Sequence, residues 1–451
     1  MRQTVDWFVK NFQRLLDWLR QKTIHKEIGL ATLQALPFWI ASLLTGLVAV
    51  AYEKLFSIFE HLGTLLYIQS PVLSFVYIPG FFLLSWWLVR QYAPTSRGSG
   101  IPQLMASIEL ANPRHDARVD KLLSLKIAAV KIISSLSLLL GHGAIGREGP
   151  TLQISASIFR FVNRMLPDFW PPISKRIMLV TGGASGLAAA FNTPLGGIVF
   201  VVEELTKTHI TQFRTAVFAS VIIAGMTAQS LLGPYLYLGF PKITPVGFSF
   251  VWVVLVTGAV SGLMGAYLAK LLLWLSDWKA RHFTKLYQQI IFVLVLGVLF
   301  AALLSVMGPN AGGSGKELMN RLLFTDHKQV HWYEFPGRFL GPVLSYMSGG
   351  AGGIFATSLS AGAALGALIA EVLHITQANY NLVILISMVG YLTGVTRSPF
   401  TSAILVLEMT DRHSAIFYLL LGAAVAGLIG HAVDRKSFYE HLKEKFILET
   451  A

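Results

Sequence analysis

Long apolar stretches follow one another along most of the chain, and short polar connections separate them. The ten stretches are 28–52, 72–89, 123–146, 178–202, 215–233, 250–275, 288–307, 339–370, 380–396 and 401–431. A helix needs about 20 consecutive apolar residues to cross a bilayer, so the pattern predicts an all-α polytopic membrane protein. Several stretches are longer than one span or contain glycine and proline. We therefore expect tilted and broken helices, whose breaks are candidate functional sites.

The composition points to lipid as the surroundings of most of the chain. Of 451 residues, 54% are hydrophobic and only 13% are charged, about half the charged fraction of roughly 25% in a soluble domain. This excludes an ordinary soluble enzyme. The net charge of +13 does not indicate nucleic acid as a partner, because the basic residues lie in short runs between apolar stretches. The chain has no cysteine, so we expect no disulfide and no thiolate metal site. His327, His331 and Glu334 have helical spacing, but they lie in a polar connection with no fourth ligand evident, so we expect no metal site there either.

The chain divides into four parts. Residues 1–29 are basic and have apolar residues at helical spacing, which predicts an amphipathic cytoplasmic helix. Two membrane repeats are expected at 30–233 and 234–433, and a C-terminal helix and tail at 434–451. Basic residues precede the first long span but follow its counterpart in the second repeat. Because positive flanks face the cytoplasm, the two repeats are expected to have inverted topology.

Three sequence markers recur in the same order, about 205 to 215 residues apart. The pairs are Gly98–Gly100 with Gly313–Gly315, Gly146–Pro150 with Gly352–Ala356, and Pro194–Glu203 with Pro399–Glu408. Transporters built from two such repeats bind their substrate where the repeats meet. The markers are therefore where chemistry is expected.

The break at Gly146–Pro150 places a base and an acid in adjacent positions. An ionised side chain at bilayer depth costs about 2.5–3.5 kcal/mol, and a helix N-terminus opening at Pro150 would compensate for Glu148. Such a terminus binds a carboxylate or an inorganic anion alike. Glu148 is therefore a candidate gate that leaves an anion site on protonation, with Gly149 among the anion-binding residues. The alternative is a capping glutamate paired with Arg147.

Two further breaks offer uncharged anion ligands. Gly352 and Gly353 precede a predicted helix start, where the backbone N–H groups of Ile354 and Phe355 are available. Ser99 lies between two glycines and offers a hydroxyl at another helix start. The alternatives are close helix packing for the glycine pair and ordinary loop structure for Gly-Ser-Gly.

Two adjacent acids, Glu203 and Glu204, end an apolar run. The second repeat has only Glu408 at the matching place, so Glu204 is an addition peculiar to the first half. An acid at such a position is a candidate proton-transfer group, and solvation at the surface is the alternative. Lys131 lies inside another apolar run and must find a partner or extend toward the surface, and the sequence leaves this open.

Taken in order, the motifs resemble the CLC family of chloride channels and chloride/proton antiporters. They are Gly-Ser-Gly-Ile-Pro at 98–102, Gly-Arg-Glu-Gly-Pro at 146–150, Gly-Gly-Ile-Phe-Ala at 352–356 and the late Tyr439. The resemblance covers about residues 30 to 440. It implies a homodimer with one pore in each subunit, and bound chloride ions with no other cofactor.

The resemblance also implies site residues. The hydroxyls of Ser99 and Tyr439 and the amides of Ile354 and Phe355 would bind the central chloride. Glu148 would be the external gate. Glu204 would be the internal proton-transfer residue, with Glu203 beside it.

These expectations lead to the prediction of a proton-coupled chloride antiporter in a prokaryotic inner membrane, with chloride, protons and lipid as partners. A second acid at Glu204 resembles the antiporters, and a passive channel is the alternative within the family. A membrane-embedded enzyme using Glu148 and His142 is the alternative outside it, but no Ser/His/acid or metal constellation converges in the apolar stretches. Gln103 stands where many relatives have glutamate, and its role stays open.

Overall fold

The fold is given by a computed structural model that describes residues 26–206, 214–233, 236–325, 328 and 331–451. The predicted N-terminal helix at 1–29 lies almost wholly outside the described residues. The described part consists of helices and short connections, with two isolated backbone bridges as its only extended pairing. The prediction of an all-α fold is confirmed.

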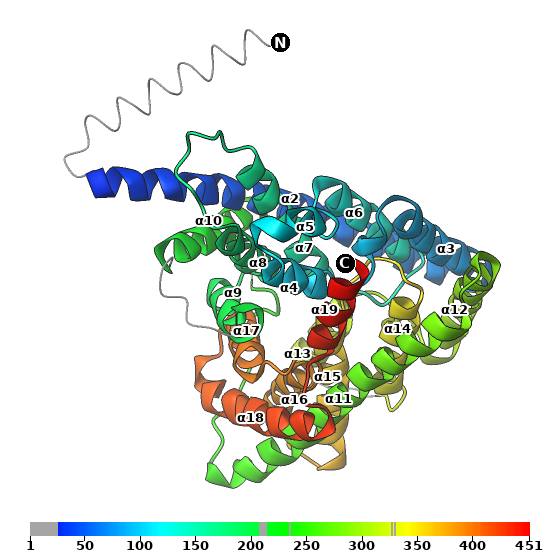
Figure 1. The fold of residues 1–451 in the computed structure, drawn as a ribbon. Coiled ribbons are helices and arrows are strands. Elements are labelled where there is room, and N and C mark those ends of the chain that lie inside the picture. The colour runs from blue at the N-terminus through cyan, green and yellow to red at the C-terminus, as the bar shows by residue number, and fades with distance from the viewer. Residues whose placement is uncertain (1–25, 207–213, 234–235, 326–327, 329–330) are drawn as a thin grey trace.

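The first half of the chain forms helices α2 to α10 (Figure 1). Their bounds are α2 (Lys26–Gln69), α3 (Ser74–Tyr92), α4 (Ile101–Glu109), α5 (Asp116–Asp120), α6 (Leu125–Leu140), α7 (Glu148–Arg164), α8 (Lys175–Phe191), α9 (Pro194–Phe200) and α10 (Arg214–Leu232). A π-helical turn over Val201–Thr206 follows α9 directly. π-helical turns are rare in proteins, and those that occur often lie at functional sites.

The second half forms helices α11 to α19. Their bounds are α11 (Val251–His282), α12 (Leu286–Met307), α13 (Lys316–Phe324), α14 (Glu334–Met347), α15 (Phe355–Val372), α16 (Tyr380–Thr396), α17 (Pro399–Thr410), α18 (Ile416–Val433) and α19 (Phe438–Glu449). The nine-residue α13 follows the long α11 and α12, just as the nine-residue α4 follows the long α2 and α3. The helix order of the first half therefore recurs in the second.

The same local chemistry starts matching helices in the two halves. Both α4 and α13 follow a glycine in the left-handed region, Gly100 with φ of 104° and Gly315 with φ of 85°. A side chain would strain the backbone at either position. Both α9 and α17 begin with a proline, Pro194 and Pro399. Proline suits this position because the N–H it lacks would have no partner inside the helix.

Eight helical segments among the described residues are long and apolar enough to cross a membrane. The most apolar windows of α15 and α16 are 83% and 89% buried, whereas those of α10 and α18 are 33% and 28% buried. Helix α16 packs against α11, α15 and α18 (Figure 1). The helices at the centre of the second half are thus surrounded by protein, whereas α10 of the first half and α18 of the second present apolar side chains to lipid or to another protein.

Two glutamates tie the halves together by capping each other's helices. Glu203, after α9, accepts hydrogen bonds from the backbone N–H groups of Phe400 (3.0 Å) and Thr401 (2.6 Å) at the start of α17. Glu408, in α17, accepts from Leu195 (3.0 Å) and Gly196 (2.6 Å) at the start of α9. Each carboxylate satisfies N–H groups that have no partner within their own helix. The contact is reciprocal, as an approximate two-fold relation between the halves requires.

Candidate functional site

The predicted breaks of the two halves meet back to back. Gly146 and Gly353 exchange two backbone hydrogen bonds, from Gly146 N to Gly353 O (2.7 Å) and from Gly353 N to Gly146 O (2.8 Å). Gly98 is joined in the same way to the chain around Ala351, through Gly350 O (2.9 Å) and Gly352 N (3.1 Å). These bonds satisfy the backbone where the helices are interrupted, and they bring the starts of α4, α7 and α15 to one place.

Glu148 lies at the first residue of α7 and is 1% exposed. Its Oε1 accepts a hydrogen bond from the hydroxyl of Tyr237 at 3.4 Å. The backbone N–H of Ala356, in the first turn of α15, faces the same carboxylate. Arg147 forms its ion pair with Glu53 of α2 instead. The arrangement therefore differs from the alternative in which Glu148 pairs with Arg147.

The hydroxyls of Ser99 and Tyr439 are buried close to each other. The two side chains interact, yet neither hydroxyl makes a hydrogen bond of normal geometry to another described residue. A buried hydroxyl without a partner costs about 1–3 kcal/mol. The same two groups can donate to an anion between them. Gly149 leaves room here, since a side-chain carbon at Gly149 would overlap Ser99 Oγ.

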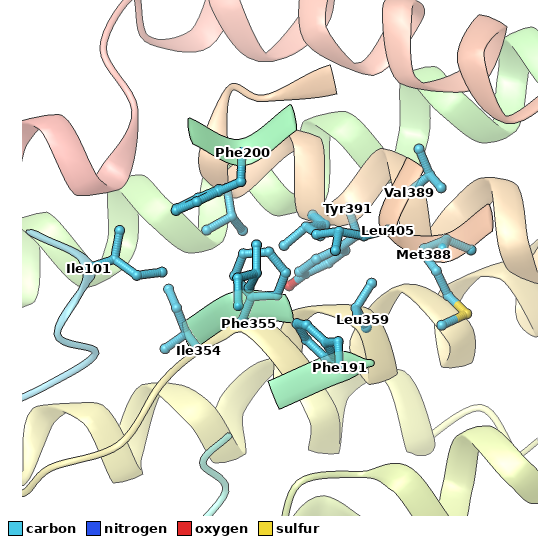
Figure 2. Packing of buried hydrophobic residues seen from close by; sticks show 14 of the residues in the cluster. Ile101, Phe191, Phe200, Ile354, Phe355, Leu359, Met388, Val389, Tyr391 and Leu405 are labelled. Atoms are coloured by element: carbon cyan, nitrogen blue, oxygen red, sulfur yellow. The ribbon is translucent and has the colours of Figure 1, made fainter. Parts of the chain in front are cut away.

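Ile354 and Phe355 contribute backbone N–H groups to the site, because their side chains are apolar. Phe355 is the first residue of α15 and Ile354 its N-cap, and both are 1% exposed. Their N–H groups therefore have no acceptor within the helix. Figure 2 shows Ile354 and Phe355 within a cluster of buried aliphatic and aromatic side chains, and the ring of Phe355 is 5.6 Å from that of Phe191. The packed rings exclude water from the start of α15.

Glu204 and Glu203 are adjacent in sequence but have different surroundings. Glu204 is 3% exposed and accepts hydrogen bonds from Ser398 Oγ (2.6 Å) and Ser437 Oγ (3.3 Å). Ser437 caps α19, the helix that carries Tyr439. The carboxylate of Glu203, by contrast, is held by the start of α17. Glu204 thus lies in direct contact with the start of the helix that carries Tyr439.

Two residues whose roles the sequence left open support the loop around Ser99. The Lys131 ammonium is buried and donates to the carbonyl of Gly98 at 2.9 Å. Gln103 Nε2 donates to the carbonyls of Thr95 (3.0 Å) and Arg97 (2.7 Å). Both side chains therefore hold the backbone that presents Ser99.

Two cavities approach these groups. One of about 600 Å³ is lined by Arg97, Gly98 and Lys279, among others, and so reaches the loop of Ser99. A smaller one of about 40 Å³ is lined by Glu148 and Tyr237 together with residues of α2 and α13. The described residues contain no group of three His, Cys, Asp or Glu side chains that could hold a metal ion.

Comparison with known proteins decides the family. Residues 80–431 match the family described as voltage gated chloride channel. The chain belongs to this family. The prediction of a CLC family member is therefore confirmed, and its matched region contains Glu148, Glu204 and the start of α15.

Relatives and solved structures agree with this assignment. The chain is 29% identical over 422 residues to proteins named H(+)/Cl(-) exchange transporter ClcA from Salmonella agona and Citrobacter koseri, covering 89% of this chain and 86% of each relative. It superimposes with a TM-score of 0.79 on a slow cyanobacterial Cl-/H+ antiporter, at 24% identity, covering 92% of this chain and 98% of the other. For a CLC-type fluoride/proton antiporter the TM-score is 0.76, at 20% identity, covering 93% and 98%. These structures confirm the CLC fold.

Several residues at the CLC site were missed by sequence reasoning. Ser398 and Ser437 both precede helix starts, and Ser437 forms a capping box with Glu440, so a search for helix caps was a usable signal. Tyr237 and Glu53 carry no local signal. Each reaches the site from a segment distant in sequence.

Proposed function

We propose that this protein is a proton-coupled chloride antiporter. The observation that carries the proposal is the arrangement of two buried carboxylates, Glu148 and Glu204, around Ser99 and Tyr439, whose hydroxyls make no hydrogen bond of normal geometry to another described residue. Glu148 lies at the start of α7, and Glu204 contacts the cap of the helix that carries Tyr439. Membership of the CLC family and relatives named as H(+)/Cl(-) exchange transporters support this function over an enzymatic one.

Chloride binds between Ser99 and Tyr439 and the free N–H groups of Ile354 and Phe355 in this proposal. The hydroxyls and amides carry no net charge, so they bind the anion without trapping it. Gly149 contributes the close approach of α7 to Ser99. Bound chloride ions are the only non-protein component required.

Glu148 acts as the gate. Its carboxylate lies among helix N-termini that attract anions, so the ionised side chain competes with chloride for the same positive potential. Protonation removes the negative charge and its attraction to those N–H groups. Chloride then binds at the position that the carboxylate occupied. Because a nearby chloride favours the neutral carboxyl group, chloride binding and proton binding at Glu148 promote each other.

Glu204 passes protons at the other end of the path. Its carboxylate is buried and accepts hydrogen bonds from two serine hydroxyls, so it is kept apart from bulk water. Glu203 has a different part in the proposal, because its oxygens are occupied by α17. The proton route therefore depends on Glu204, with Glu203 fixing the turn in which Glu204 sits.

The protein acts as a homodimer in a cell inner membrane, with one pore per subunit. Large apolar side chains are exposed at the starts and along the faces of α9, α10, α17 and α18, which Figure 1 shows on one side of the molecule. They are Leu195, Phe218, Ile222, Met226, Phe400, Phe417 and Leu428. Such a face suits a second copy or lipid. The two membrane repeats are assigned to 30–233 and 234–433, with the pore tyrosine carried by 434–451.

The deciding experiment measures chloride and proton movement together from liposomes holding the purified protein. Wild type is expected to move protons against chloride, and chloride flux without proton movement would replace the antiporter by a passive channel. Glu148→Ala is expected to keep chloride flux and lose coupling. Glu204→Gln is expected to abolish proton movement while some chloride flux remains. The matched control is Glu203→Gln, which should keep coupling; loss of coupling there would move the proton role to Glu203.

A further inference from the structure

A tyrosine from outside the helices contacts the gate. Tyr237 lies in the connection between α10 and α11, is 3% exposed, and donates to Glu148 Oε1 at 3.4 Å. Neither the spacing of the motifs nor the hydrophobic pattern pointed to this connection. It brings a hydrogen-bond donor to Glu148 from a segment outside the helix breaks of the two halves.

Tyr237 is held in place by packing on several sides. Its ring meets that of Phe191 edge to face, with the centroids 5.1 Å apart. The next residue, Leu238, donates its backbone N–H to the carbonyl of Met409 in α17 at 3.1 Å. The Lys316 ammonium lies over the ring of Tyr237, 4.9 Å from its centroid. The hydroxyl is therefore aimed at Glu148 by a fixed ring rather than by a mobile loop.

Lys316 is itself positioned by the glycine loop of the second half. It is the first residue of α13, directly after Gly315. The preceding Ser314 donates its N–H to Glu60 Oε1 at 2.5 Å and its carbonyl accepts from Arg338 at 2.9 Å. A cation over an aromatic face draws on the electron density of the ring, and this strengthens the phenol as a donor.

We propose that Tyr237 is a positioning residue for the gate and that Lys316 supports it. Together they set the pH at which Glu148 becomes protonated and leaves the anion-binding position. This inference rests on the proposed gating role of Glu148. A hydroxyl donor stabilises an ionised carboxylate more than a neutral carboxyl group. Removing the donor therefore lets Glu148 become protonated, and the path become available, at a higher pH.

Other charged groups around Glu148 are already engaged with partners of their own. They are Arg147 with Glu53, Glu60 with the N–H of Ser314, and Arg338 with the carbonyls of its loop. Lys316 faces the same small cavity as Glu148 and adds a positive charge. Among the described residues, Tyr237 contributes the side-chain donor to the carboxylate. The effect of Tyr237 is thus separable from the surrounding charges.

The test measures chloride efflux from liposomes over a range of pH. Tyr237→Phe keeps the ring and removes the hydroxyl, and the pH of half-maximal flux is expected to rise by about half a pH unit, as for a long hydrogen bond to a charged group. Lys316→Gln should move it the same way by less, and Lys316→Arg should restore the wild-type profile. The matched control is Tyr418→Phe, whose hydroxyl donates to Val246 O (3.0 Å) on the same connection.

Two further results separate this inference from the proposed function. In a Glu148→Ala background, Tyr237→Phe should leave chloride flux unchanged at every pH, because its target is gone. An unshifted profile for Tyr237→Phe, a shift in the control of equal size, or a shift that persists without Glu148 would each overturn the inference. Proton movement recorded in the same liposomes tests antiport independently, since a wild type that moves chloride alone can still show the Tyr237→Phe shift.

Discussion

The two Gly-Ser-Gly loops have the same local structure but different chemistry. In each, a buried cation donates to a carbonyl of the loop: Lys131 to Gly98 in the first half, Arg338 to Gly313 and Ser314 in the second. Ser99 then leaves its hydroxyl without a normal hydrogen bond, whereas Ser314 Oγ accepts from the N–H of Lys316 at 3.3 Å. The difference teaches that inverted halves can share a fold while, of these two serines, Ser99 alone keeps a hydroxyl available for the role of anion ligand that we propose.

A second difference concerns the ends of α9 and α17. The carboxylates of Glu203 and Glu408 make the same reciprocal caps. The residue after each is Glu204 in the first half but Met409 in the second. Glu204 accepts from Ser398, while the counterpart hydroxyl of Thr193 has no hydrogen-bond partner among the described residues. The repeated fold therefore supplies the scaffold, and a single substitution between the halves supplies Glu204, the acid that we propose to transfer protons.

The largest expected effect comes from removing the cation that holds the second loop. Arg338 is fully buried and donates to Gly312 O (2.6 Å) and Ser314 O (2.9 Å), so Arg338→Met leaves both carbonyls without a donor. We expect a loss of about 2–6 kcal/mol of stability, because each buried carbonyl left without a donor costs about 1–3 kcal/mol. Thermal unfolding in detergent measures it. Lys131→Met, which removes one such bond, should cost less; an equal cost would contradict the comparison.

The next effect distinguishes the two serines. Ser99→Ala removes a hydroxyl that is free for an anion, and we expect chloride affinity to fall about 10-fold, equivalent to about 1.4 kcal/mol. Ser314→Ala removes a bond within the loop and should leave affinity unchanged. Chloride titration by calorimetry measures both. Equal losses of affinity would show that the second loop also binds the ion.

The reciprocal caps should respond equally. Glu203→Gln and Glu408→Gln each weaken two hydrogen bonds to a helix start, and each should lower stability by about 1 kcal/mol. The measurement is the shift in unfolding temperature of each variant under identical conditions. A much larger effect for one of them would mean that the two contacts are not equivalent.

The smallest effect is expected at the hydroxyls of Ser398 and Thr193, which precede α17 and α9. Ser398→Ala removes the shorter of two serine bonds to Glu204, and proton flux should fall a few-fold, in line with about 1 kcal/mol for one hydrogen bond. Thr193→Val, which keeps the side-chain shape in the other half, should leave proton flux unchanged. Parallel recording with pH and chloride electrodes shows whether proton movement alone responds.

Sequence reasoning reached the helix class, the repeats and the family because these depend on local or repeated patterns. The apolar stretches predicted membrane helices, and the repeated glycine and proline markers correspond to helix starts at Gly100, Gly315, Pro194 and Pro399. The roles of Glu148, Glu204, Ser99 and Tyr439 stay predictions. Their burial and neighbours are what the structure adds to them.

The residues that the sequence did not predict are those that contact the site in space but lie far from it in sequence. Lys131 had no assigned partner, and the choice between Glu203 and Glu204 rested on the repeat and on the family resemblance, without any contact of either side chain. Tyr237 is 89 residues from Glu148 and Glu53 is 94 residues from Arg147 (237 − 148 and 147 − 53). No periodicity links positions so far apart.

The sequence by itself determined where helices form and break, because spacing of apolar residues, glycine and proline acts within a few residues. It also determined that the same pattern occurs twice. Only the tertiary structure decided which breaks meet, which serine keeps a free hydroxyl, and which of two adjacent glutamates caps a helix. The physical reason is that hydrogen bonding and burial of these groups depend on partners brought together by packing, and two residues of the same type in the same motif differ once their partners differ.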